Sequence, residues 1–163
     1  MDFALFISFF IAQRILELLV ARKNERWLLA NGAVEYGRGH YPIIVMLHVF
    51  FIISLIAEYT VKTDARLDIF FLILFFVLLS AKIWVIVSLG KFWNTKIFRI
   101  PDAPSVRKGP YKYLKHPNYI IVICEFIVVP LVFHLYYTSI IFSLLNFIVL
   151  RIRIREENIV WNH

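Results

Sequence analysis

The chain has 163 residues, of which 61% are hydrophobic, and its mean hydropathy is +0.75. A soluble protein of this length needs far more polar surface around its core, so this composition excludes a soluble globular domain and indicates a membrane-embedded one. The net charge is +7, but the basic residues lie in short segments between apolar runs, where they face lipid headgroups. We therefore expect one integral membrane domain over residues 1–163, with membrane lipids rather than nucleic acid as partners.

Five apolar segments follow one another along the chain, each near the roughly 20 residues that a bilayer requires. The last two are short and separated by only a few residues, so they form a helical hairpin. The predicted fold is an all-α membrane protein with about five transmembrane helices. The predicted spans are about Phe3–Val20, Pro42–Val61, Leu67–Leu89, Pro117–Phe133 and Tyr136–Leu150.

The connection between the first two spans has a character of its own. Residues 22–31 are typical of a short interfacial helix that ends at Asn31-Gly32, and a glycine-punctuated loop follows. Trp27 and Tyr36 suit the headgroup zone. This connection is either a simple linker or a flap over a membrane-facing pocket.

The distribution of Lys and Arg predicts the orientation of the chain. Fourteen lie in the connections on one side of the five spans and two, Lys62 and Arg66, lie in the connection on the other. The positive-inside rule then places the N-terminus outside the cell membrane and the C-terminus in the cytosol.

Residues 108–119 carry the most information about chemistry. Gly109-Pro110 is typical of a turn. His116 precedes a proline, which favours extended backbone, and Pro117 suits the first position of the next helix. The segment is either a charged loop before a helix or, with the free amides of that helix and the nearby basic side chains, an anion site.

Charged residues inside and just after the spans are further candidates. Arg14 and Glu17 are three residues apart and can pair on one helix face, or they and Glu125 can line a substrate-binding cavity. The tail from Arg151 to Glu157 alternates apolar and charged residues, as either snorkelling anchors or part of a polar pocket.

Metal and nucleotide motifs are absent from the sequence. His40, His134 and His163 lack metal-ligand spacing to a carboxylate, and no H-E-x-x-H occurs. His48 is typical of a packed polar residue. No glycine-rich phosphate loop follows a strand, so a nucleotide-type cofactor would not be held by a Rossmann fold.

GPYKYLKHPNY (109–119), a helical hairpin and then RIRIREEN (151–158) resemble the isoprenylcysteine carboxyl methyltransferase family of integral-membrane enzymes. The segments KNERWLLANGA (23–33) and GKFWNTKI (90–97) are similar to its small bacterial branch. Compared with the family pattern, Lys115 stands in place of Arg and Ile121 in place of Gly. Arg155 takes the first position of the Glu pair, so Glu156 and Glu157 both fit that pair.

The resemblance implies S-adenosylmethionine (SAM) as the methyl donor, held between the His-Pro loop and the C-terminal segment on the cytoplasmic side. Arg151 and Glu156 would be catalytic by position. The residues bordering the cofactor would be Gly109, Tyr111, Lys115, His116, Pro117, Tyr119, Glu156 and Glu157.

Methyl transfer to a lipophilic acceptor is thus the leading expectation. The acceptor would be a carboxylate, such as a prenylated cysteine, or a hydroxyl, such as a long-chain phenol or pyrone. A phenol or enol would need Glu156 or Glu125 to take its proton. Two alternatives stay open: a membrane reductase using a nicotinamide cofactor, and a non-catalytic transporter or scaffold with a polar path through Arg14, Glu17 and Glu125. The sequence leaves the oligomeric state open.

Overall fold

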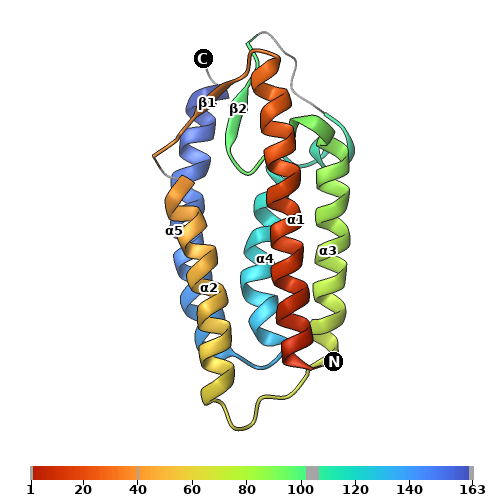
Figure 1. Cartoon of the computed structure of the whole chain (residues 1–163), viewed down its shortest axis with the longest axis vertical. Coiled ribbons are helices and arrows are strands. Elements are labelled where there is room, and N and C mark those ends of the chain that lie inside the picture. The colour runs from red at the N-terminus through yellow and green to blue at the C-terminus, as the bar shows by residue number, and fades with distance from the viewer. Residues whose placement is uncertain (1, 40, 102–106, 162–163) are drawn as a thin grey trace.

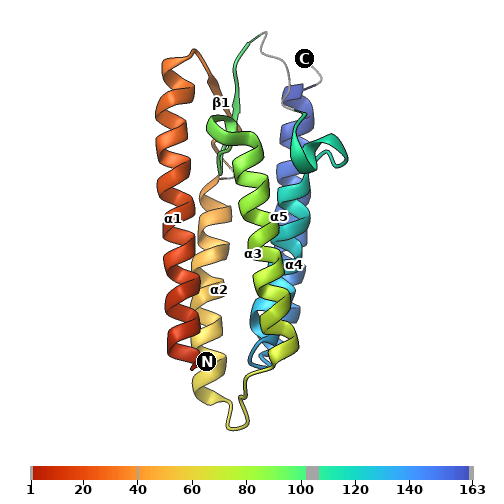
Figure 2. The ribbon, with the colours of Figure 1, turned by 90° about the vertical axis from the view of Figure 1, so that its right-hand side faces the viewer.

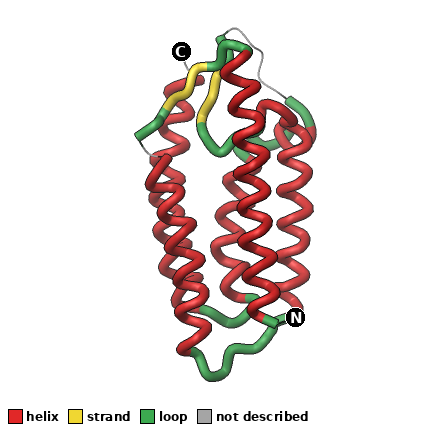
Figure 3. The backbone as a smooth tube through the Cα atoms, in the orientation of Figure 1, coloured by secondary structure: helices red, strands yellow, loops and turns green. Residues whose placement is uncertain are grey.

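The computed structural model describes residues 2–39, 41–101 and 107–161, with side chains up to residue 159. Its helices run nearly parallel in one bundle (Figures 1 and 3). They are α1 (Phe3–Ala30), α2 (Tyr41–Val61), α3 (Ile69–Leu89), α4 (Pro117–Leu131) and α5 (Tyr136–Trp161). Two 3-10 helices, η1 (Gly90–Phe92) and η2 (Gly109–Lys112), and two strands, β1 (Val34–Tyr36) and β2 (Ile97–Arg99), lie in the connections.

The predicted class, an all-α membrane protein, is confirmed. In the described part of the chain, four helices are long and apolar enough to cross a membrane, and α4 is a shorter apolar helix of 15 residues. At 1.5 Å per residue α4 extends about 22 Å, less than the hydrocarbon thickness. Successive helices run in opposite directions, so the N-terminus and the C-terminus lie at opposite ends of the bundle (Figures 1 and 2).

The predicted short interfacial helix over residues 22–31 is wrong as a separate element. These residues continue α1, because neither Gly nor Pro interrupts the chain before Gly32. Gly32 has φ +78°, a conformation suited to glycine just after a helix end. The Asn24 side chain donates to the carbonyls of Gly90 and Trp93 at 3.0 and 2.7 Å, which fixes the extension of α1 to the end of α3.

A two-stranded sheet, which the sequence analysis did not predict, joins the α1–α2 and α3–α4 connections. β1 and β2 are antiparallel, with Val34 opposite Arg99 and Tyr36 opposite Ile97. Lys96, next to β2, has its Nζ 2.7 Å from a carboxylate oxygen of Glu25 on α1. The sheet lies at the C-terminal end of the bundle (Figure 1), and its strand β2 lines the candidate site.

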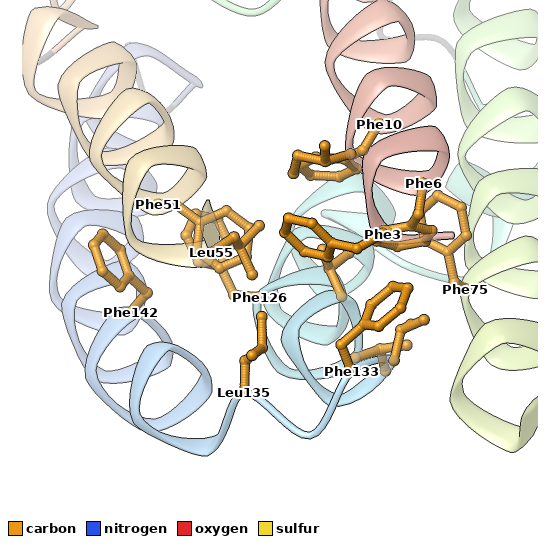
Figure 4. Packing of buried hydrophobic residues seen from close by; sticks show 14 of the residues in the cluster. Phe3, Phe6, Phe10, Phe51, Leu55, Phe75, Phe126, Phe133, Leu135 and Phe142 are labelled. Atoms are coloured by element: carbon orange, nitrogen blue, oxygen red, sulfur yellow. The ribbon is translucent and has the colours of Figure 1, made fainter. Parts of the chain in front are cut away.

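Aromatic packing holds the opposite half of the bundle together (Figure 4). Phe3 stacks on Tyr59 with ring centroids 3.7 Å apart, and Phe51 lies 4.4 Å from Phe126. Because lipid tails are as apolar as these side chains, close van der Waals packing is what favours helix association in a bilayer. The buried apolar residues concentrate in this half, whereas the larger cavity lies at the other end.

Candidate active site

A cavity of about 570 Å³ opens at the C-terminal end of the bundle. Its walls come from the end of α1, the end of α3 with the segment through β2, the η2 loop, the first turn of α4 and the last turns of α5. This volume is within the range of small-molecule and cofactor sites. The lining is mixed, because apolar side chains such as Leu28 and Ile97 share it with charged ones such as Lys96 and Arg153.

The loop before α4 is held against α3 by a close backbone approach at Gly109. Its φ is +53°, and a Cβ at this position would lie 2.1 Å from Ser88 Oγ and 3.2 Å from Trp84 Nε1. Only glycine fits there without displacement. Pro117 then occupies the first turn of α4, as predicted from its position after His116. The result is that Tyr111 and His116 reach the cavity from one short loop.

Four side chains from α4, α5 and the His-Pro loop form a polar chain at the cavity wall. Arg153 Nε donates to the Tyr119 hydroxyl at 2.8 Å, and that hydroxyl donates to Glu157 Oε2. His116 Nδ1 lies 3.5 Å from the same Glu157 oxygen, and its ring stacks on that of Tyr119 with centroids 5.2 Å apart. We call these residues, Arg153, Tyr119, Glu157 and His116, the polar chain.

Burial shifts the titration of two residues outside the helices' apolar spans. The pKa of His116 is lowered mainly by burial, partly opposed by the nearby Glu157 carboxylate and reinforced by the Lys115 ammonium. Burial raises the pKa of Tyr111, and the negative charge of Glu157 raises it further. Both side chains are therefore neutral near pH 7.

Three buried polar atoms at the cavity have no hydrogen-bond partner within the described residues: Trp93 Nε1, His116 Nε2 and Asn118 Oδ1. Burying an unpaired polar group costs about 1–3 kcal/mol, so groups of this kind commonly face a ligand or water. An indole donor, an amide acceptor and an imidazole nitrogen suit a polar ligand rich in donors and acceptors.

Most of the residues predicted to border a cofactor meet at this cavity. Tyr111, Lys115, His116, Tyr119 and Glu157 all line it, although 38 residues of sequence separate Tyr119 from Glu157. Lys115 Nζ also donates to Asn158 Oδ1 at 2.7 Å, a second link between the loop and α5. Gly109 and Pro117 shape the backbone and are not among the lining residues.

Arg151 and Glu156, predicted to be catalytic, do not line this cavity. The Arg151 guanidinium lies 4.6 Å from the Phe147 ring on an exposed face of α5, beside a separate shallow depression. The tail continues α5 as a helix, and residues two apart on a helix point about 200° away from each other. Arg153, 8% exposed and missed by the sequence analysis, is therefore the arginine of the tail that lines the cavity.

Arg153, which the sequence analysis missed, did carry a sequence signal. Arg153 and Glu157 are four residues apart, as are Arg151 and Arg155, so a helical reading of the tail sorts them onto two faces. Leu150, buried and three residues before Arg153, marks which of those faces turns inward. No comparable pattern identifies Trp93 or Asn118.

Arg14, Glu17 and Glu125, predicted to bind substrate, form a separate ionic cluster among α1, α3 and α4. Arg14 bridges both carboxylates, at 2.9 Å to Glu17 and 2.8 Å to Glu125. Lys82 completes the cluster, 2.6 Å from Glu125 and 3.3 Å from Glu17. These residues do not line the cavity, and their two positive and two negative charges balance. His48 Nδ1 donates to the Ile44 carbonyl of its own helix, 2.8 Å away.

Among the described residues, no group of three or more His, Cys, Asp or Glu side chains could hold a metal ion. His40 and His163 lie outside the described residues.

An apolar helical bundle with a ligand-sized cavity of mixed polar and apolar lining at one end defines an integral membrane protein with a candidate small-molecule site. The chain belongs to the isoprenylcysteine carboxyl methyltransferase (ICMT) family, which matches residues 69–163. This membership implies membrane methyltransferase activity. It also supports the resemblance drawn from the His-Pro and Arg-Glu motifs.

Two curated bacterial proteins are similar along nearly their whole length. The uncharacterized protein YpbQ of Bacillus subtilis is 43% identical over 159 residues, covering 96% of this chain and 94% of its own. An uncharacterized protein of Haemophilus influenzae is 28% identical over 157 residues, covering 94% and 91%. No solved structure matches the chain.

Proposed function

We propose that the protein transfers a methyl group from SAM to an oxygen atom of a lipophilic, membrane-resident acceptor. The observation that carries this proposal is the meeting of two distant segments at one cavity. His116 from the loop and Glu157 from the end of α5 lie 3.5 Å apart there, with Tyr119 and Arg153 beside them. Family membership supplies the reaction type.

The cavity residues fit the chemistry of SAM. Its purine and ribose need donors and acceptors, which the unpartnered Trp93 and Asn118 atoms can provide. Its amino-acid carboxylate suits a cationic neighbour such as Lys115, and its ammonium and sulfonium suit the Glu157 carboxylate. The volume of about 570 Å³ leaves room for a small polar molecule of this size.

When bound, SAM supplies an activated methyl group on a sulfonium. The protein's own residues then need to align the acceptor oxygen with that methyl carbon and to exclude water. Good alignment of two bound partners can contribute about 7–11 kcal/mol. Tyr119, held between Arg153 and Glu157, is fixed in position for this task, because each of its two hydroxyl hydrogen bonds has a buried or half-buried partner.

The acceptor reaches the cavity from the bilayer in this proposal, and the cofactor reaches it from the cytosol. The distribution of Lys and Arg supports a cytosolic position for the cavity end and an external N-terminus. A prenylcysteine-like carboxylate and a long-chain phenol or pyrone are both acceptors of suitable polarity and apolar length.

Ligand binding and labelling test the proposal together. The protein purified in detergent is heated with S-adenosylhomocysteine or with a nicotinamide dinucleotide, and the unfolding midpoint is recorded. We expect stabilisation by the first alone. Membranes from expressing cells, incubated with methyl-labelled SAM, should yield a labelled lipid that mass spectrometry identifies. Stabilisation by the dinucleotide alone would favour a reductase, and no response to either with no labelled lipid would favour a transporter or scaffold.

A further inference from the structure

The two ring nitrogens of His116 have different surroundings. Its Nδ1 lies 3.5 Å from Glu157 Oε2, whereas its Nε2 is buried, has no partner among the described residues and belongs to a side chain that lines the cavity. A proton on Nδ1 faces the carboxylate, and this tautomer leaves the lone pair of the imidazole on Nε2. The neutral ring therefore presents a proton acceptor at the cavity wall.

We propose that His116 is the general base of the reaction and that the acceptor is a lipid with a weakly acidic hydroxyl, such as a phenol or enol. This inference rests on the proposed function and makes it more specific. A carboxylate acceptor is already ionised at neutral pH and has no proton to give, so a cavity built for it would not need a neutral imidazole. A phenol, with a pKa near 10, does need one.

The step balances without a further reactant. His116 Nε2 takes the hydroxyl proton while the acceptor oxygen forms its bond to the methyl carbon of the sulfonium donor. The carbon–sulfur bond breaks, and its electron pair stays on sulfur, which becomes a neutral thioether. Glu157 stabilises the imidazolium formed on His116, which later releases its proton to water.

The rest of the polar chain prepares Glu157 for this role. Its Oε2 accepts from the Tyr119 hydroxyl, which in turn accepts from the buried Arg153. The Tyr119 hydroxyl, itself held by Arg153, therefore fixes the position of the Glu157 carboxylate beside His116 Nδ1. The charged and titratable groups that face His116 are Lys115 on its own segment, Tyr119 on α4 and Glu157 on α5.

The carboxylates of the ionic cluster cannot take this role. Glu125 Oε2 contacts both Lys82 Nζ and Arg14, at 2.6 and 2.8 Å, and a carboxylate that binds two cations is a weak base. Glu125 also does not line the cavity. Among the cavity's neutral groups, the His116 imidazole, with its free Nε2, is a stronger proton acceptor than the Asn118 amide or the Trp93 indole.

The test compares acceptors of different acidity in the purified full-length protein. The variant is His116→Asn, whose amide can still donate toward Glu157 but offers nothing at the position of Nε2. The probes are 4-dodecylphenol, a nitro-substituted dodecylphenol that is ionised at the assay pH, and palmitate. Each is supplied with methyl-labelled SAM, and S-adenosylhomocysteine binding is measured separately by calorimetry.

We expect His116→Asn to lower kcat for 4-dodecylphenol by about 10²- to 10⁴-fold and for the ionised phenol by less than about fivefold. Its affinity for S-adenosylhomocysteine should change little. The matched control is His134→Asn, at the far end of the bundle, where φ is +56° and asparagine is tolerated. It should retain wild-type rates.

Two results would overturn the inference while leaving methyl transfer intact: an equal loss for both phenols in His116→Asn, or a wild-type enzyme that methylates palmitate and neither phenol. A wild-type protein that binds no S-adenosylhomocysteine and methylates none of the three probes would instead overturn the proposed function and this inference with it.

Discussion

Lys82 Nζ lies 2.6 Å from Glu125 Oε2, although 43 residues separate them in sequence. The two side chains are 2% and 1% exposed, and they connect α3 to α4 in the middle of the bundle. Arg14 and Glu17 on α1 complete the cluster, so three helices meet at one balanced set of charges. These ion pairs link α1, α3 and α4 to one another.

Lys82→Met should destabilise the protein by about 3–5 kcal/mol, because it leaves two buried carboxylates facing the single Arg14 cation. The double variant Lys82→Met/Glu125→Gln should recover part of that loss, since it restores neutrality. Unfolding in detergent, followed by circular dichroism, measures both. Lys62→Met, which breaks an ion pair to the 84% exposed Asp64, is the control and should cost less than about 1 kcal/mol. A further loss of stability in the double variant, instead of a partial recovery, would contradict this role of the ionic cluster.

Arg153→Ala should lower kcat/KM by about 10- to 100-fold, because the Tyr119 hydroxyl loses a charged, buried hydrogen-bond donor. Arg151→Ala is the matched control from the same helix and should stay within about twofold of the wild type, since Arg151 packs over Phe147 away from the cavity. Initial rates of lipid methylation decide between them. The reverse order would restore Arg151 as the catalytic arginine.

Glu157→Gln should reduce methyl transfer more than Glu156→Gln, by about tenfold or more against about twofold or less. Glu157 accepts from Tyr119 and lies beside His116, whereas Glu156 does not line the cavity. The sequence alone favoured Glu156. Rates of both variants at saturating SAM measure the difference, and equal effects would mean that the polar chain has no catalytic importance.

Gly109→Ala should destabilise the protein and weaken S-adenosylhomocysteine binding, because the new Cβ would lie 2.1 Å from Ser88 Oγ and push the His-Pro loop off α3. Gly32→Ala is the control: its φ is also positive, but nothing lies within 4 Å of the added atom. It should cost only about 1–2 kcal/mol of backbone strain. A Ser88→Gly change should partly rescue Gly109→Ala, and a failure to do so would place the strain elsewhere.

The rate of methyl transfer to a phenol should fall in acid as His116 becomes protonated. Because burial lowers the pKa of His116, the neutral form is present at pH 7 and the loss begins below the usual value of about 6.5. For the same reason the contribution of His116 to folding stability is present above pH 6.5 and declines as the pH falls toward its folded pKa. Profiles of kcat/KM from pH 5 to 9 should show this acidic limb in the wild type and lack it in His116→Asn.

The sequence predicted the membrane class and the places where helices begin. Apolar runs of nearly bilayer length located all five helices, and Pro117 located the start of α4 at the observed residue. It did not predict how far α1 and α5 continue beyond the bilayer-length runs, because charged residues end an apolar pattern without ending a helix. α1 runs ten residues past the predicted end at Val20 and α5 eleven past Leu150.

What the sequence by itself determined was the class of protein and the two motifs, His116-Pro117 and the Arg-Glu tail, since hydropathy and local backbone preferences are properties of neighbouring residues. Which arginine and which glutamate face the cavity was decided by tertiary structure. The packing of α5 against α4 sets the rotation of that helix, and a rotation of half a turn would exchange Arg153 for Arg151. The pairing of Lys82 with Glu125 likewise arises only when α3 and α4 pack, because no local pattern links residues 43 positions apart.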